Sequence, residues 1–247
     1  MGFVPGVGAD LATQVADGLD EAEFPGLSWQ TLPSPPTVVA WCRVLTAADA
    51  ERGLARLSPS EQTLIGRLRQ AEDRARSVTA RLLLAAAVRA LVGDPGRPVR
   101  LEERPHPLGR GKPRLNLDGW DASISHDEDA ILVGVSAALI GVDVQSLASA
   151  ARIRRLAAAF TAAEQSWLHA VPGDRRAVEL WTAKEALLKA LGSGFAVDTR
   201  AEAADVLRAP AAGLSIACFE PQAAATAAIA LRAGYPAPWP PRFRHFG

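Results

Sequence analysis

The sequence has few cysteines and no net charge. Its two cysteines, Cys42 and Cys218, are too few for a disulfide scaffold or a cysteine zinc site. We expect both to be free thiols in a reducing cytoplasm. Lys plus Arg and Asp plus Glu each total 27, so the chain lacks the basic field that drives nucleic-acid binding. These absences predict a cytoplasmic protein without a nucleic-acid partner.

Long apolar runs are also missing. The longest one near the middle of the chain, residues 82–88, is much shorter than the ~20 residues of a membrane-spanning helix. The first basic residue is Arg43, so the N-terminus has no positive region of the kind that opens a signal peptide. We therefore expect no membrane partner. The 247 residues, 49% of them hydrophobic, are enough to bury a core in one large or two small domains.

Lysine is the scarcest charged residue. The chain has 24 arginines but only three lysines, namely Lys112, Lys184 and Lys189. Lysine is a compact charge whose pKa shifts readily, whereas arginine stays charged. The positions at which an Arg-rich chain keeps Lys are therefore candidates for chemistry, with chance as the alternative.

The composition divides the chain into four segments. Residues 1–37 contain five acids and no base, and they form an expected extension that ends in a Pro-rich linker at 33–36. Residues 38–138 and 139–232 are predicted to be an N-terminal and a C-terminal half. Residues 233–247 are a Pro-rich tail.

The apolar patterns predict helices and strands in a similar order in both halves. The expected helices are residues 46–53, 58–69, 74–92, 152–160, 162–169 and 177–191. The expected strands are residues 38–44, 99–103, 131–135, 140–144, 214–219 and 226–231, of which 131–135 and 140–144 are predicted to form a hairpin. A capping box is expected at Ser58 and Glu61, and a helix end at Gly93. This order indicates an α/β protein of two similar halves that meet near residue 138.

The segment Gly141-Val142-Asp143-Val144-Gln145 places a carboxylate inside an apolar strand. Such a carboxylate is costly unless it is paired, protonated or bound to a metal ion. Residues 143 and 145 point to the same face of a strand, and the carboxylate of Asp143 is a candidate Mg²⁺ ligand. An Asp that caps a turn at the strand end is the alternative.

The segment Trp181-Thr182-Ala183-Lys184-Glu185 continues through Lys189 on a predicted helix. Residues 181, 185 and 189 recur every four positions and share one face. A surface Glu–Lys pair, worth only ~0.2–0.5 kcal/mol, is the alternative. A chemical role gains weight because two of the three lysines lie here.

Two further segments could bind anions. Ser125-His126-Asp127 cannot form a catalytic triad, because adjacent residues do not reach triad geometry, but Ser and His at a strand edge can hold phosphate. Residues 109–114 gather three basic side chains and two glycines in a loop without the Walker A pattern. An ordinary basic loop is the alternative.

In this order and spacing, the four segments resemble the 4′-phosphopantetheinyl transferases of the surfactin-synthetase type. The resemblance spans roughly residues 38–232. It rests on Gly111-Lys112-Pro113, Ile124-Ser125-His126, Gly141-Val142-Asp143-Val144 and Trp181-x-x-Lys184-Glu185-Ala186-x-x-Lys189, with Ser58-Pro59 and Glu72-Asp73-Arg74-x-Arg76-Ser77 as weaker matches. It implies an α/β (α+β) fold of two pseudosymmetric halves, each a small antiparallel sheet packed with a long helix.

The resemblance also implies a reaction and its residues. The phosphopantetheine arm of coenzyme A would pass to a serine of an apo acyl- or peptidyl-carrier protein, as in a holo-[acyl-carrier-protein] synthase, with release of adenosine 3′,5′-bisphosphate. Asp143, Glu185 and Lys189 are the expected catalytic residues. The expected Mg²⁺ ligands are Asp143, Glu185 and Gln145. The expected coenzyme A contacts are Lys112, Ser125, His126, Arg76, Ser77, Lys184 and Arg67. Because the duplicated halves would complete the site, we expect a monomer.

The sequence departs from the family pattern at two places. Many relatives have a second acid where this chain has Gln145, and a neutral amide is a poorer Mg²⁺ ligand. Some relatives have lysines where this chain has Glu61 and Leu64, so the 3′-phosphate clamp would rest on arginines, namely Arg67, Arg69, Arg76 and Arg81. The first departure leaves open an alternative, a catalytically weak homologue that binds coenzyme A or a carrier protein.

Overall fold

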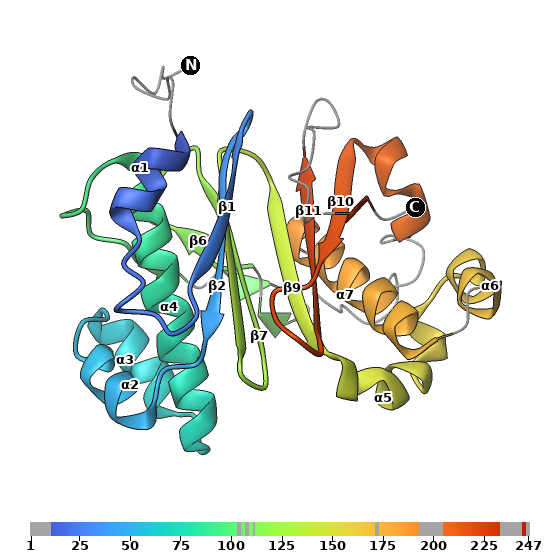
Figure 1. Cartoon of the computed structure of the whole chain (residues 1–247), viewed down its shortest axis with the longest axis horizontal. Coiled ribbons are helices and arrows are strands. Elements are labelled where there is room, and N and C mark those ends of the chain that lie inside the picture. The colour runs from blue at the N-terminus through green and yellow to red at the C-terminus, as the bar shows by residue number, and fades with distance from the viewer. Residues whose placement is uncertain are drawn as a thin grey trace.

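The chain folds into two antiparallel sheets that face each other, with a long helix on the outer face of each (Figure 1). This computed structural model describes residues 11–102, 105–106, 109–110, 112–170, 173–192, 205–232 and 244–245. A sheet with one face on a helix and the other on a second sheet is apolar on both sides, as the short apolar strands predict.

The N-terminal sheet has the strand order β1-β2-β8-β7. These strands are β1 (Ser28–Pro33), β2 (Pro36–Arg43), β8 (Ala130–Ser136) and β7 (Asp121–Asp127). Its outer face packs on α4 (Ala71–Val92), which ends at the left-handed Gly93 as the sequence predicts. The helices α2 (Ala47–Leu54) and α3 (Pro59–Gly66) precede α4, and α3 begins with the predicted capping box of Ser58 and Glu61.

The C-terminal sheet has the strand order β12-β10-β11-β9. These strands are β12 (Arg244–His245), β10 (Leu214–Phe219), β11 (Ala225–Arg232) and β9 (Ile140–Ser146). Its outer face packs on α7 (Asp174–Leu191). Around α7 lie α5 (Ala150–Arg154), α6 (Ala162–Ala170) and the short 3-10 turns η1 (Leu147–Ser149), η2 (Ala157–Ala159) and η3 (Val206–Ala212). Of the predicted tail, only Arg244–His245 is described.

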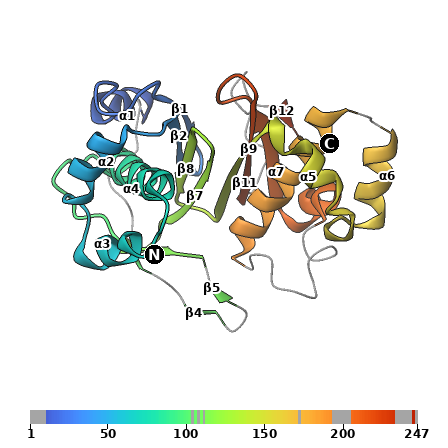
Figure 2. The ribbon, with the colours of Figure 1, turned by 90° about the horizontal axis from the view of Figure 1, so that it is seen from below.

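Two short strand pairs complete the described residues. β3 (Leu101–Glu102) pairs with β6 (Arg114–Leu115), and β4 (Pro105–His106) pairs with β5 (Gly109–Arg110). The second pair extends from the N-terminal half, below the sheets (Figure 2). Gly111, which the motif Gly111-Lys112-Pro113 includes, lies outside the described residues.

The inner faces of the two sheets form a shared core between the halves. Trp41 of β2 and Phe219 of β10 meet there with ring centroids 4.9 Å apart. The Trp41 indole N–H donates to the carbonyl oxygen of Pro221 at 3.1 Å. The halves are therefore joined by an apolar interface with an aromatic pair in it.

The expected N-terminal extension is part of the first half. α1 (Leu11–Gly18) packs on α4, and Val15 and Phe24 are fully buried in the core of that half. The predicted Pro-rich linker is wrong, because Pro33 and Pro36 pair at the turn between β1 and β2. The local pattern misled the prediction because a sheet tolerates proline at the end of an edge strand, as in β1, and at the first residue of a strand, as in β2.

The predicted hairpin of residues 131–135 and 140–144 is also wrong. β8 pairs with β2 on one side and β7 on the other over its whole length, so it has no free edge for β9. β9 pairs instead with β11, and the chain crosses from one sheet to the other between Ser136 and Ile140. The predicted fold class is nevertheless confirmed: helices and antiparallel sheets combine in an α/β fold. None of the helices in the described ranges is long and apolar enough to span a membrane.

Candidate active site

The site is built where α7 crosses β9. At the crossing, Gly141 lets the strand approach the helix so closely that a Cβ there would be 2.4 Å from the backbone nitrogen of Ala190. Trp181, on the same face as Glu185 and Lys189, is buried and packs edge-on against Phe160 with ring centroids 5.9 Å apart. The glycine and the buried Trp thus fix where the rest of this helix face lies.

Asp143, two residues along β9 from the crossing, is the centre of the site and is only 2% exposed. Its Oδ1 accepts a hydrogen bond from the Ser125 hydroxyl at 2.7 Å and from the Lys189 ammonium at 2.7 Å. Lys189 also donates to the carbonyl oxygen of Ile124 at 3.4 Å. The other oxygen, Oδ2, is buried and has no hydrogen-bond partner among the residues that the structure describes.

Glu185 lies one helical turn before Lys189 and is half-buried. Its pKa is raised to about 7, first by burial and then by the negative charge of Asp143, while Lys189 and Arg152 lower it. A neighbouring negative charge disfavours the ionised form of a carboxyl group such as that of Glu185. Asp143 and Glu185 therefore form a site that favours a cation.

This pair fits a magnesium ion. Mg²⁺ prefers carboxylate oxygens, and it commonly binds one or two carboxylates while water and substrate phosphates complete its coordination. The Oδ2 of Asp143, which has no hydrogen-bond partner among the described residues, and the raised pKa of Glu185 both fit a cation between the two carboxylates. Within the described ranges no cluster of three or more His, Cys, Asp or Glu side chains exists, so an ion held by the protein alone is not indicated.

Gln145 shares the face of β9 with Asp143, but its amide oxygen is engaged. It accepts a hydrogen bond at 3.3 Å from Arg152, a residue of α5. The same guanidinium lowers the pKa of Glu185. A cation beside that oxygen would also lie near Arg152, which disfavours Gln145 as a metal ligand, and the assignment of Gln145 stays a prediction.

A second group of charges gathers beside Lys189. The pKa of His126 is lowered first by desolvation and then by Lys189, Arg76 and Arg81, and Asp73 partly offsets this. Arg76 pairs with Asp73 at 2.6 Å and donates to the carbonyl oxygen of Glu128 at 3.3 Å. Side chains of α4, β7 and α7 thus form a positive cluster that suits phosphate.

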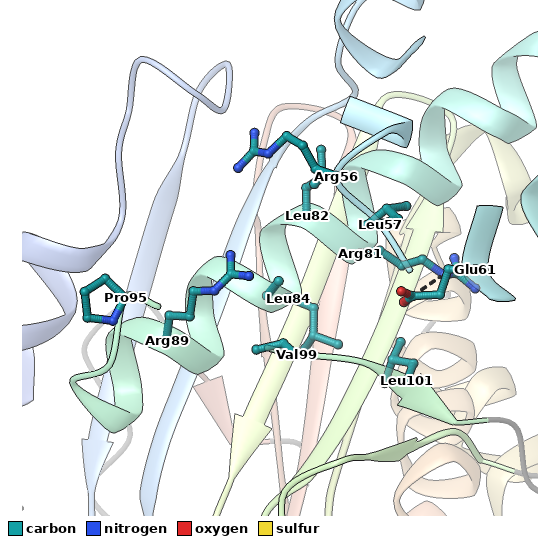
Figure 3. Close-up of a pocket in the computed structure, with 11 residues that line it drawn as sticks. Arg56, Leu57, Glu61, Arg81, Leu82, Leu84, Arg89, Pro95, Val99 and Leu101 are labelled. Atoms are coloured by element: carbon teal, nitrogen blue, oxygen red, sulfur yellow. Dashed lines mark ion pairs between the residues drawn. The ribbon is translucent and has the colours of Figure 1, made fainter. Parts of the chain in front are cut away.

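A cavity of about 310 Å³ opens beside α4, with Arg81 on its wall (Figure 3). Arg81 donates to the hydroxyl of Ser77 at 2.6 Å and lies 3.7 Å from the carboxylate of Glu61. Arg56 and Arg89 also line this cavity. Ser77 is buried behind Arg81, so the arginine presents the more accessible group. Arg67 is exposed at the end of α3, and no described contact joins it to this group.

Ser125 and Lys112 are occupied in contacts between the halves. Ser125 donates to Asp143 and accepts from the backbone N–H of Val144 at 3.2 Å. Lys112 pairs with Asp121 and donates to the carbonyl oxygen of Ile140 at 2.6 Å. Its pKa is lowered by burial, against the effect of Asp121. The expectation that these two side chains bind coenzyme A directly does not fit these contacts.

The structure also contradicts the expected ligand contact of Lys184. Its side chain is fully buried, and its ammonium lies 2.8 Å from the equally buried carboxylate of Glu164. Glu164 also accepts from the backbone N–H groups of Val206 at 2.9 Å and Thr161 at 2.8 Å. The motif places Lys184 next to Glu185 in sequence, but adjacent helical residues point in different directions.

Sequence reasoning missed Arg152. It lies within α5, seven residues after Gln145, and no periodic pattern links it to Glu185. Its place emerges only from the tertiary contacts. The scarcity of lysine pointed to three residues. Of these, Lys189 lies at the site, whereas Lys112 and Lys184 form ion pairs that stabilise the fold.

The comparison with known families agrees with this geometry. Residues 139–237 match the model of the 4′-phosphopantetheinyl transferase superfamily. The match includes β9, α7 and β11, and therefore Asp143, Glu185 and Lys189. The match covers less than half of the chain, and it shows that this region is similar to that superfamily. No curated protein matches the sequence.

Proposed function

We propose that this protein transfers the phosphopantetheine arm of coenzyme A to a serine of an apo acyl- or peptidyl-carrier protein. In this reaction the serine oxygen forms a bond to the phosphorus that carries pantetheine. The bond from that phosphorus to the oxygen of the adenosine phosphate breaks, and adenosine 3′,5′-bisphosphate leaves. The superfamily match supports the reaction class.

The observation that carries this proposal is the buried pair of carboxylates beside a lysine. Asp143 has an oxygen without a partner in the described part of the chain, Glu185 has a pKa of about 7, and Lys189 is 2.7 Å from Asp143. Phosphoryl transfer depends on charge neutralisation and positioning rather than on covalent chemistry by the protein. This constellation supplies groups for both tasks.

Asp143 and Glu185 would hold the divalent cation, and the chemistry that Mg²⁺ supplies when bound is neutralisation of the pyrophosphate. Glu185, directly or through a water molecule, accepts the proton of the carrier serine as the general base. Lys189 stabilises the negative charge of the leaving bisphosphate.

The positive cluster would bind the phosphates of coenzyme A. The charges of Lys189, Arg76 and Arg81 all act on His126, and Arg81 also lines the cavity beside α4. We place the adenosine end of coenzyme A towards Arg81. In this assignment, Ser77 orients the guanidinium of Arg81 instead of contacting the ligand.

The surfactin-synthetase subtype, Mg²⁺ dependence, a monomeric state and a cytoplasmic location belong to the same proposal. One observation favours a second candidate, a homologue that binds coenzyme A or a carrier protein but turns over slowly. In this chain, Arg152 engages Gln145 at a position where an additional acid would strengthen cation binding.

Intact-mass spectrometry of a panel of apo carrier proteins, incubated with the protein, coenzyme A and Mg²⁺, separates the two candidates. A mass gain of one phosphopantetheine on a carrier supports the transferase, and the ranking of carriers indicates its pathway. Measurable binding of coenzyme A without any mass gain supports the second candidate. Gln145→Glu would then be the variant to test for recovered transfer.

A further inference from the structure

The two sheets meet along strands that share no backbone hydrogen bonds. β9 is an edge strand of the C-terminal sheet, and β7 is an edge strand of the N-terminal sheet. The backbone N–H groups of β9 that point away from β11 therefore need other partners, since unpaired edge groups are a liability.

Side chains of β7 supply these partners in strict alternation. Four residues, which we call the β7 ladder, accept hydrogen bonds from every second N–H of β9: Asp121, Ser123, Ser125 and Asp127. The N–H groups belong to Ile140, Val142, Val144 and Ser146, at distances of 2.9, 3.0, 3.2 and 2.7 Å. Residues two apart share a face of a strand, so one face of β7 closes the edge of β9.

Ser125 differs from the other members of the ladder in one contact. A hydroxyl has one proton and two lone pairs, and Ser125 accepts from Val144 while its proton goes to Oδ1 of Asp143 at 2.7 Å. Ser123 makes the equivalent bond to Val142 and is equally buried, at 6% exposed, but it does not touch Asp143.

This contact determines which oxygen of Asp143 stays available. Oδ1 accepts from both Ser125 and Lys189, and Oδ2 keeps no partner among the described residues. A half-turn of the carboxylate only exchanges two equivalent oxygens, but any other rotation would break both bonds and move the available oxygen. The orientation of Asp143 is therefore set from the N-terminal half, through β7, and not from β9 alone.

We infer that Ser125 is a positioning residue that orients Asp143 for a divalent cation and couples the joint between the two halves to the site. This inference rests on the proposed function and deepens it. It gives Ser125 a role in cation binding rather than in contact with coenzyme A. It also explains why Ser125 of β7 and Lys189 of α7 both donate to the same oxygen of Asp143.

The test compares Ser125→Ala with Ser123→Ala, because each variant loses one bond to an amide of β9. We expect a decrease in Tm for both variants, larger for Ser125→Ala because it also loses the bond to Asp143. Binding of Mn²⁺, followed by electron paramagnetic resonance without carrier protein, should be weakened about tenfold in Ser125→Ala only, since the lost hydrogen bond is to a charged group. Ser125→Thr retains a hydroxyl and should restore binding.

Each outcome decides between the roles. Equal Mn²⁺ affinity of Ser125→Ala and Ser123→Ala, with the wild type binding Mn²⁺ and modifying carriers, overturns the positioning role and leaves the proposed function intact. A wild-type protein that neither binds Mn²⁺ nor modifies any carrier overturns both. If Ser125→Ala does not fold, Ser125→Cys, which keeps the volume but donates weakly, takes its place with the same expected loss.

Discussion

Gly141 of β9 lies so close to α7 that a Cβ at this position would be 1.9 Å from the carbonyl oxygen of Ala186. No side-chain rearrangement relieves such a contact, because the atoms that the Cβ would meet belong to the backbone of α7. Asp143 lies two residues after Gly141 on β9. Because strand and helix are so close at Gly141, Asp143 is within reach of Lys189 on α7. The packing of β9 on α7 thus requires a glycine at position 141, and the contact between Asp143 and Lys189 depends on that packing.

Gly141→Ala should therefore separate α7 from β9. We expect a loss of stability of about 3 kcal/mol or more, at or above the upper end for overpacked cores. Gly66→Ala is the matched control, since a Cβ at the end of α3 meets nothing within 4 Å, and it should change stability by less than about 1 kcal/mol. Urea unfolding of both variants measures the difference, and equal midpoints would refute the packing argument.

The buried pair of Lys184 and Glu164 should behave as a structural unit. Lys184→Met leaves a fully buried carboxylate without its cation, which costs about 3–5 kcal/mol, and the double variant with Glu164→Gln should recover much of this loss. Chemical unfolding of the single and double variants tests the coupling. Folded Lys184→Met that keeps its stability but loses coenzyme A affinity would restore the ligand role that the sequence predicted.

Glu185 should make the stability of the metal-free protein depend on pH. Its pKa is about 7 in the folded protein and 4.5 for an ordinary Glu, so the folded state binds the proton more tightly. This contribution is fully present below about pH 4.5 and is lost as the pH rises through about 7. In chelator, Glu185→Gln should have a higher Tm than the wild type at pH 8.5, and the difference should shrink towards pH 5. A difference that grows on acidification would contradict the sign.

Arg152 should tune the pH profile of transfer. It lowers the pKa of Glu185, so Arg152→Ala should move the acidic limb of the pH–rate profile to higher pH by about half a unit, a modest shift because Arg152 is exposed. Arg154→Ala, on the same helix, removes only the exposed ion pair with Asp174 and serves as the control. Identical acidic limbs for the two variants would remove Arg152 from the site.

Local signals in the sequence were sufficient for the elements that local chemistry builds. Ser58 and Glu61 form their capping box, Gly93 ends α4 in the left-handed conformation, and residues 214–219 form β10 as predicted. The i, i+4 spacing also placed Glu185 and Lys189 on one face, where the structure brings both to Asp143.

Features that depend on distant partners could not be predicted in this way. The apolar run at 140–144 matches a hairpin partner of β8, but β8 has both edges occupied and the strand pairs with β11. Ser125 carries no pattern that distinguishes a phosphate ligand from a hydroxyl shared between Asp143 and Val144. In the same way, the residues around Lys184 in the sequence do not show that its partner is Glu164, twenty residues away.

The central claim is that Asp143, Glu185 and Lys189 carry out phosphopantetheine transfer. Its most direct test quantifies holo carrier protein by intact mass and adenosine 3′,5′-bisphosphate by chromatography in the same reaction. For the wild type with Mg²⁺ we predict equal amounts of the two products, and neither in excess chelator. Glu185→Gln should fold and slow both by at least about 100-fold, the contribution of a general base. Wild-type rates in Glu185→Gln, or unchanged turnover in chelator, would contradict the account.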